Sequence, residues 1–245
     1  MVLGGPDFYD DSSVFETYRQ HRSRADNPND TLEKPITLEL IGDVKDKRIL
    51  DLGCGDGQFG RELFGKGCES YVGIEASQNM IKLARETLAG TRGEVIRARI
   101  EEWAYPPLSF DLVVSRLSIH YIENVDALFQ SVHNTLTLGG RLVFSVEHPV
   151  ITSCSRSYAS GQGLRQDWIV DDYFNTGQRV THWLGGQVVK YHRTVEDYHS
   201  ALQNSGLKVE TLRESHPQRA YFSTEATYER RKRIPLFLFL AASKN

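Results

Sequence analysis

A short apolar run that ends in three alternating glycines constrains the fold of this 245-residue chain more than any other stretch. Residues 49–52 are apolar except for one acid, a pattern that predicts a buried strand. Gly53, Gly55 and Gly57 follow directly. Glycine adopts positive φ angles and lets another molecule approach the main chain closely. The stretch therefore predicts a cradle for the polar part of a ligand, outside the carboxyl end of a strand in an α/β sheet.

Two acids indicate what kind of ligand the cradle holds. Asp51 stands at the end of the first strand, where it would repel a pyrophosphate but suit an ammonium group. Residues 70–75 predict a second strand that ends in Glu75. Glu75 lies about 20 residues after Gly55, the separation at which a carboxylate reaches ribose hydroxyls and can accept both of their protons. Either acid alone is more often an exposed loop residue, but together they favour a nucleoside with an ammonium group.

The order acid-x-Gly-x-Gly-x-Gly, from Asp51 to Gly57, resembles motif I of the class I S-adenosylmethionine (SAM) methyltransferases. The resemblance implies an enzyme that uses SAM as cofactor and releases S-adenosylhomocysteine. It also implies a Rossmann-like α/β fold, with a seven-stranded, mostly parallel sheet, helices on both faces and an antiparallel last strand. Residues 55–60 also match the dinucleotide fingerprint G-x-G-x-x-G, but a dinucleotide enzyme prefers an apolar residue at position 51.

The rest of the sequence alternates strands with helices, as that fold requires. Strict alternation implies a parallel sheet with helices on both faces, and two strands joined without a helix should pair antiparallel. A polar stretch, residues 215–233, has no clear pattern. The predicted strands are residues 48–52, 70–75, 94–98, 110–115, 141–146, 207–212 and 236–243, and the predicted helices between them are residues 58–66, 77–88, 125–136 and 194–204.

Four parts are expected along the chain. Residues 1–11 lack periodicity and are expected to be mobile, and residues 13–16 match a capping box that would open a helix. Two strand-like runs within residues 179–192 indicate a hairpin that interrupts the alternation. We expect an N-terminal helical lid at 1–44, a SAM-binding core at 45–149, a cap insertion with the hairpin at 150–193, and the C-terminal part of the core at 194–245.

The resemblance also implies a cofactor site, carried over position by position. It consists of Asp51 at the methionine end of SAM, Gly53, Cys54 and Gly55 along the loop, Glu75 at the ribose, Ala76 and Met80 on the adenine, Ile100 and Glu101 at the adenine edge, and Ser115 at the amino end. The family has an Asp where Arg99 stands, so Glu101 either takes that role or is solvated. Tyr18 and Arg22 would fold over the cofactor, with the Arg22 guanidinium on the methionyl carboxylate or else in solvent.

Histidines that follow strand ends are the candidate catalytic residues. His120 follows the fourth strand and His148 the fifth, and His192, at the end of the hairpin, is a third candidate. The unperturbed pKa of histidine, near ~6.5, suits a general base that takes a proton from the methyl acceptor. The alternative for each is a structural histidine whose ring is hydrogen-bonded within the fold.

Two further segments resemble a bacterial branch of these enzymes, of the type 11/25 kind, which act on small molecules. They are residues 145–149, S-V-E-H-P, and residues 190–194, K-Y-H-R-T. This resemblance implies the cofactor and not the acceptor. Our hypothesis is methyl transfer to an N or O atom of a small-molecule acceptor by in-line displacement. The alternatives are an RNA or protein methyltransferase, a non-catalytic SAM-binding module, and an aminopropyl transferase, which would need more acids after residue 115.

Composition sets the remaining limits. The net charge of −3 gives no global field for nucleic acid, and a basic run such as 229–233 is typical of a solvated face, so we expect no nucleic-acid partner. No apolar run reaches the ~18 residues of a membrane span, so we expect no membrane association. Three widely spaced cysteines fit neither a zinc site nor a disulfide framework and favour the cytoplasm, where we expect a monomer or homodimer with no bound metal.

Overall fold

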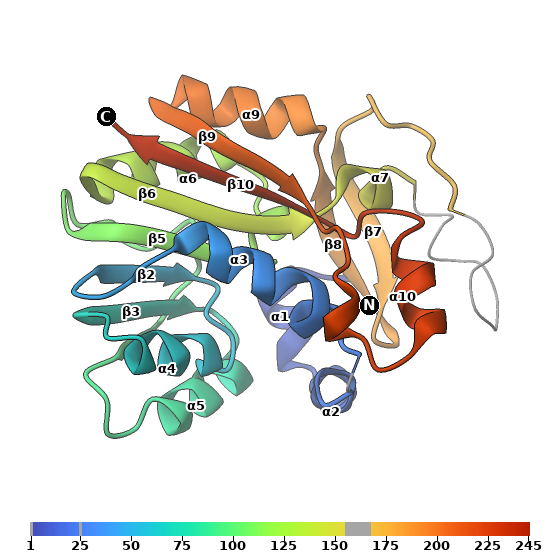
Figure 1. The fold of residues 1–245 in the computed structure, drawn as a ribbon, viewed down its shortest axis with the longest axis horizontal. Helices are drawn as coiled ribbons and strands as arrows, with labels where there is room; N and C mark the ends of the chain where they lie inside the picture. Colours follow the sequence, from blue (N-terminus) through green and yellow to red (C-terminus); the bar gives the residue numbers. More distant parts are fainter. Residues whose placement is uncertain (1, 25, 155–167) are drawn as a thin grey trace.

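A seven-stranded sheet forms the centre of the structure, a computed structural model that describes residues 2–24, 26–154 and 168–245 (Figure 1). Its strand order is β4-β3-β2-β5-β6-β10-β9. β10 is antiparallel to both of its neighbours and the other neighbouring pairs are parallel, which confirms the predicted sheet. The strands are β2 (Arg48–Leu52), β3 (Ser70–Glu75), β4 (Glu94–Arg97), β5 (Phe110–Arg116), β6 (Leu136–Glu147), β9 (Leu207–Glu214) and β10 (Phe237–Lys244).

Helices cover both faces of this sheet, as predicted. Side chains of successive residues in a strand point to opposite faces, and in β2 Ile49 joins one apolar cluster while Leu50 and Leu52 join the other. α3 and α4 contribute to the first cluster, and α6 and α9 to the second. No helix in the described part of the chain is long and apolar enough to cross a membrane. The helices are α3 (Lys34–Ile41), α4 (Gln58–Gly65), α5 (Gln78–Thr87), α6 (Val125–Thr135) and α9 (Val195–Asn204).

Side-chain caps fix where two of the helices begin. Thr194 accepts from the Asp197 amide and Asp197 accepts from the Thr194 amide, so the predicted N-cap of α9 is confirmed as a full capping box. The capping box expected at residues 13–16 is wrong. α2 (Ser12–Arg22) is capped instead by Asp11, whose carboxylate accepts from two main-chain amides at 2.9 and 3.1 Å.

The N-terminal segment is structured, so the expectation of a mobile segment is wrong. β1 (Val2–Leu3) pairs in parallel with a strand of the hairpin, and α1 (Gly5–Asp10) follows it. Phe8 is only 1% exposed because it packs with Val14 and Val188, residues of α2 and of the hairpin. The strand pairing of β1 and the packing of Phe8 are tertiary contacts, and the periodicity of a local sequence does not predict such contacts.

The hairpin predicted within residues 179–192 is present as β7 (Gly177–Trp183) and β8 (Gly186–His192), which pair antiparallel. With β1 they form a second, three-stranded sheet. Residues 155–167 of the expected cap insertion lie outside the described residues. The remaining short elements are η1 (Asn29–Glu33), a π-helix, η2 (Ile119–Tyr121), α7 (Pro149–Thr152), η3 (Arg219–Tyr221) and α10 (Glu225–Arg231), the last two within the segment for which the sequence gives no clear pattern.

A buried carboxylate joins the N-terminal helices to the sheet. Glu33 is 0% exposed and accepts from Arg116 Nε at 2.9 Å, from Ser145 Oγ at 2.8 Å and from Thr37 Oγ1 at 2.7 Å. Arg116 and Ser145 belong to β5 and β6, at the edge where the sheet carries its loops. A buried charge is tolerated only when it is paired and hydrogen-bonded, as Glu33 is here.

We expect the Glu33→Ala substitution to lower the free energy of unfolding by about 3–5 kcal/mol, because it leaves the Arg116 guanidinium without its partner. The matched control is Glu39→Ala, which removes an exposed partner of Arg213 and should cost at most about 1 kcal/mol. Urea denaturation followed by circular dichroism measures both. Equal losses for the two variants would contradict this role of Glu33.

Candidate active site

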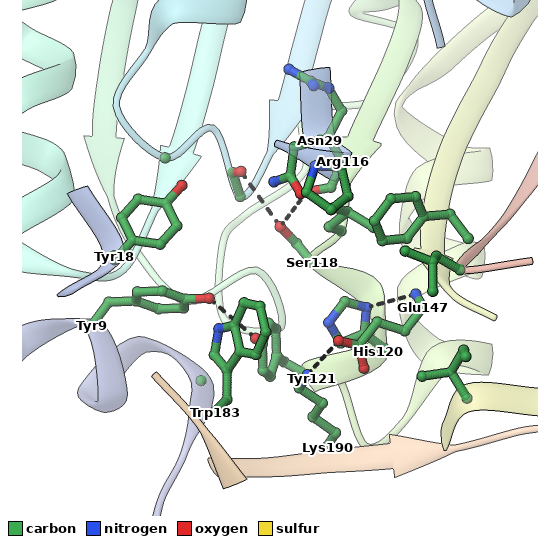
Figure 2. Close-up of a pocket in the computed structure, with 18 of the residues that line it drawn as sticks. Tyr9, Tyr18, Asn29, Arg116, Ser118, His120, Tyr121, Glu147, Trp183 and Lys190 are labelled. Carbon is green, nitrogen blue, oxygen red and sulfur yellow. Dashed lines mark hydrogen bonds and ion pairs between the residues drawn. The ribbon is translucent and has the colours of Figure 1, made fainter. Parts of the chain in front are cut away.

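One cavity of about 870 Å³ opens at the carboxyl edge of the sheet, where β2, β3, β5 and β6 end. Its wall combines the glycine loop, α1 and α2, the loop that follows β5, and the hairpin. Figure 2 shows Tyr9 and Tyr18 on one side of it, facing His120, Glu147 and Lys190 on the other. Ligands of α/β sheets bind at this edge, so the position alone makes the cavity the candidate site.

The glycine loop has the geometry that the sequence predicts. Gly53 has φ +79°, and a Cβ atom there would lie 2.1 Å from Ser118 Oγ, so no larger residue fits without displacement. Gly55 has φ +57°, and a Cβ atom there would meet nothing within 4 Å. The loop thus presents main chain, not side chains, to open space in the cavity.

Glu75 holds the loop in place from the end of β3. One carboxylate oxygen accepts from the Gly55 amide at 3.0 Å and the other from the Ser77 amide at 2.8 Å. Burial raises the pKa of Glu75, and these amide hydrogen bonds oppose the shift. Ala76, Met80, Ile100 and Glu101 line the cavity with Glu75, so the structure brings these predicted residues together.

Three predicted cofactor residues lie behind the wall and do not line the cavity. Asp51 is 1% exposed, and its Oδ2 accepts from the Tyr71 hydroxyl at 2.8 Å. Burial raises the pKa of Asp51 to about 7 and also raises that of the Cys54 thiol. Ser115 donates to the Leu52 carbonyl at 2.8 Å. These three side chains lie beneath the loop, and contact of any of them with the cofactor stays a prediction.

The N-terminal pair divides between the cavity and another partner. Tyr18 lines the cavity, and burial raises its pKa. Arg22 does not line it: its Nη2 lies 3.3 Å from Asp30 Oδ1, and its contact with a methionyl carboxylate stays a prediction. Sequence reasoning missed Tyr9, whose hydroxyl lies 3.2 Å from that of Tyr121, because the segment before residue 12 has no periodic pattern.

His120 is the candidate catalytic residue that the structure places in the wall. It is 2% exposed, and its Nδ1 accepts from the Glu147 amide at 3.4 Å. Burial lowers the pKa of His120 to about 3, so the ring is neutral at physiological pH. With Nδ1 as an acceptor, the ring proton of the neutral form sits on Nε2.

His148 and His192 have structural hydrogen bonds. His148 does not line the cavity: its Nδ1 caps α7 by accepting from the Val150 amide, and its Nε2 lies 2.9 Å from Glu214 Oε1. The ring of His192 contacts the Thr152 hydroxyl at 2.7 Å and the Tyr173 carbonyl at 2.9 Å. For His148 the geometry favours the structural alternative over a catalytic role, since both of its ring nitrogens are engaged away from the cavity.

A buried ion pair in the wall was missed. Lys190 Nζ lies 2.6 Å from Glu147 Oε1, and the Lys190 side chain is 1% exposed. Its ammonium also lies 5.7 Å from the centre of the Tyr121 ring and 5.5 Å from that of Trp183. The pair joins β8 to the end of β6, so it fixes the hairpin over the cavity. Both residues stand in the two segments that resemble the bacterial branch, but nothing in their spacing indicates that they meet.

Comparisons with known proteins agree with this geometry. A family model described as a methyltransferase domain matches residues 50–144. An uncharacterized protein of Haemophilus influenzae is 31% identical over 216 residues, which cover 84% of this chain and 85% of that protein. The solved structure of a SAM-dependent methyltransferase from Mesorhizobium loti is 34% identical, with a TM-score of 0.80 over 91% of this chain and 100% of that one. A trans-aconitate 2-methyltransferase of Acidovorax ebreus is 27% identical over 143 residues, 57% of this chain and 49% of that enzyme.

The sheet has helices on both faces, and at its carboxyl edge it carries a glycine loop and an acid at the end of a strand. Together these features define a Rossmann-like nucleoside-binding protein. The similarity over most of the chain then identifies the family: the chain belongs to the class I SAM-dependent methyltransferases. It is an enzyme that uses SAM and forms S-adenosylhomocysteine. The predictions of family, fold and cofactor are thereby confirmed.

The low pKa of His120 makes the stability of the protein depend on pH. Between its native pKa of about 3 and the ordinary value near ~6.5, the unfolded chain binds a proton that the native protein does not. Acidification through this range should therefore lower the free energy of unfolding, by at most about 1.4 kcal/mol per pH unit from this group.

Urea denaturation at several pH values between about 4 and 7 measures this dependence. His120→Asn should show a shallower loss of stability on acidification than the wild type, and the exposed His216→Asn variant controls for the removal of a histidine. If all three proteins lose stability in parallel, burial does not hold His120 neutral.

Proposed function

We propose that the enzyme transfers the methyl group of SAM to a nitrogen or oxygen atom of a small-molecule acceptor, by in-line displacement within the cavity. The observation that carries the proposal is one continuous cavity that runs from the glycine loop to His120 and Lys190. Its volume of about 870 Å³ is at the upper end of the ~300–1,000 Å³ typical of small-molecule sites. It has room for a cofactor and a small acceptor side by side.

The proposed cofactor site uses the residues that line the end of the cavity nearest β2 and β3. The main chain of Gly53 and Gly55 would meet the methionine part, Glu75 the ribose, and Ala76, Met80, Ile100 and Glu101 the adenine. Open space beside Gly55 supports this fit, since close approach to main chain is what the loop permits. When bound, SAM supplies a methyl group that its sulfonium has already activated.

The first 44 residues are proposed to act as a lid over this site. Tyr9 and Tyr18 line the cavity, and burial raises the pKa of Tyr9 to about 12, so it remains a neutral hydrogen-bonding group. Glu33 fixes the base of the lid to the sheet through Arg116. A lid excludes water from the cavity and leaves the acceptor as the nucleophile nearest the methyl donor.

Alignment supplies most of the rate enhancement in this proposal, since holding two reactants in attack geometry contributes roughly 7–11 kcal/mol. An efficient general base has a pKa near the working pH, whereas burial lowers that of His120 to about 3. We therefore propose that His120 orients the acceptor by donating from Nε2, while the proton released on methyl transfer leaves to solvent. The buried Lys190–Glu147 pair provides charged groups on the same side.

Two other functions have less support. An RNA or protein methyltransferase would present an open groove to its substrate, whereas this site lies between α1, α2 and the hairpin. A non-catalytic SAM-binding module would need no acceptor space beyond the cofactor, yet the cavity extends to His120 and Lys190. The name of the Acidovorax relative, which gives a small carboxylic acid as its acceptor, also favours a small molecule.

The test incubates the enzyme with methyl-labelled SAM and a whole extract of bacterial cells, and the products are then separated into small-molecule, RNA and protein fractions. We expect label in a small-molecule product, and His120→Ala should reduce its rate about 10- to 100-fold, the cost of one lost hydrogen bond. His120→Asn, which keeps a donor, should recover part of the rate. His148→Ala is the control and should keep the rate per folded molecule.

A general base would give a different pattern. Its loss would cost about 10²–10⁴-fold, and asparagine would not restore the rate because an amide accepts no proton. Label that appears only in RNA or protein, or in no fraction at all, would contradict transfer to a small molecule.

A further inference from the structure

Three arginines in the wall of the cavity have no salt bridge to any described residue. Arg24 follows α2, and Arg230 and Arg231 lie at the end of α10. Within the described residues, none of the three forms an ion pair. The other long cationic side chains of the wall are each paired, as Arg99 with Asp7, Arg116 with Glu33 and Lys190 with Glu147.

His21 also lines the cavity, on α2, the helix that Arg24 follows. Burial lowers the pKa of His21, and the charges of Arg24, Arg22 and Arg231 lower it further. Burial lowers the pKa of Arg231 to about 10, and the charge of Arg230 adds to that shift. Arg231 Nε is buried and makes no hydrogen bond with any described residue. This is the environment of a cation that lacks an anionic partner.

Asp26, an acid that also lines the cavity, already has hydrogen-bond partners. Both carboxylate oxygens of Asp26 accept from Ser223, from its amide at 3.0 Å and from its hydroxyl at 2.9 and 2.8 Å. These bonds join the segment before α10 to the segment after α2, the two segments that carry the arginines. The charge of Asp26 raises the pKa of Arg231, but this effect is smaller than the lowering caused by burial and by the charge of Arg230.

The basic run at residues 229–233 is therefore not simply a solvated face. Lys232 points outward and pairs with Glu229 at 2.9 Å, with both side chains about half exposed. Arg230 and Arg231, in the same run, line the cavity. A nucleic-acid surface needs a basic stripe along an open face, whereas these two groups point into a space of small-molecule size.

We propose that this end of the cavity binds an anionic group of the methyl acceptor, a carboxylate or a phosphate monoester, on Arg24, Arg230 and Arg231. Guanidinium groups bind both anions through paired N–H donors. The inference rests on the proposed function, because it names the chemical class of that acceptor. The anion would anchor one end of the molecule, and the rest would extend along Tyr18, which lines the same cavity, toward the cofactor end.

The first experiment titrates the protein loaded with S-adenosylhomocysteine with inorganic phosphate and, separately, with succinate, by calorimetry. In the double variant Arg230→Gln/Arg231→Gln, the dissociation constant of whichever anion binds should rise about tenfold or more, since hydrogen bonds between charged groups are lost. Lys232→Gln is the matched control: it removes one charge beside the same helix, outside the cavity, and should change the constant less than about twofold.

Affinity for S-adenosylhomocysteine, measured in all three proteins, should not change and shows that each is folded. The preferred anion distinguishes a phosphate from a carboxylate acceptor. Equal anion affinities in the double variant and in Lys232→Gln would overturn the proposal. So would a double variant that loses binding to transfer RNA but keeps its affinity for both small anions.

The second experiment separates this inference from the proposed function. The labelled products of the extract assay are passed over an anion exchanger. Label in the retained small-molecule fraction supports the proposal. Label only in neutral or cationic small molecules overturns the anionic acceptor and leaves the small-molecule function intact, whereas the absence of any labelled small molecule overturns both.

Discussion

The two hydrogen bonds of the Glu75 carboxylate organise the edge of the sheet on which the site depends. One reaches the Gly55 amide and the other the Ser77 amide, so a single side chain fixes both the glycine loop and the start of α5. The loop itself tolerates only glycine at position 53, where a Cβ would collide with Ser118. Main-chain geometry and one carboxylate thus create the space in which the cofactor is proposed to bind.

Buried polar contacts then hold the outer elements over that space. Glu33 binds Arg116 beneath the N-terminal helices, and Lys190 binds Glu147 beneath the hairpin. Such pairs contribute less to stability than apolar contacts of equal volume, because burying their charges costs free energy. These ion pairs do fix the position of the N-terminal helices and the hairpin over the sheet, since each buried charge has few alternative partners. Arg24, Arg230 and Arg231 are the exception, because none of them forms an ion pair within the described residues. This contrast is the basis for proposing an anionic acceptor.

Local patterns in the sequence predicted the parts of the structure that local interactions determine. The strands, the helix stripes, the glycine loop and the Thr194 cap all depend on residues that are close in the chain, and these predictions are confirmed. The lining role of Tyr9 and the Lys190–Glu147 pair depend on segments that meet only in the folded protein. His148 shows the same limit. Its position after a strand end predicts a catalytic group, but its Nε2 is hydrogen-bonded to Glu214, a residue of β9 that is distant in the sequence.

A crystal structure with bound S-adenosylhomocysteine tests the central claim most directly. The account predicts the ribose at the Glu75 carboxylate, the adenine beside Met80 and Ile100, and the sulfur atom facing the part of the cavity that His120 and Lys190 line. A ligand bound away from the Gly53–Gly57 loop, or a sulfur atom that points away from His120, would contradict it.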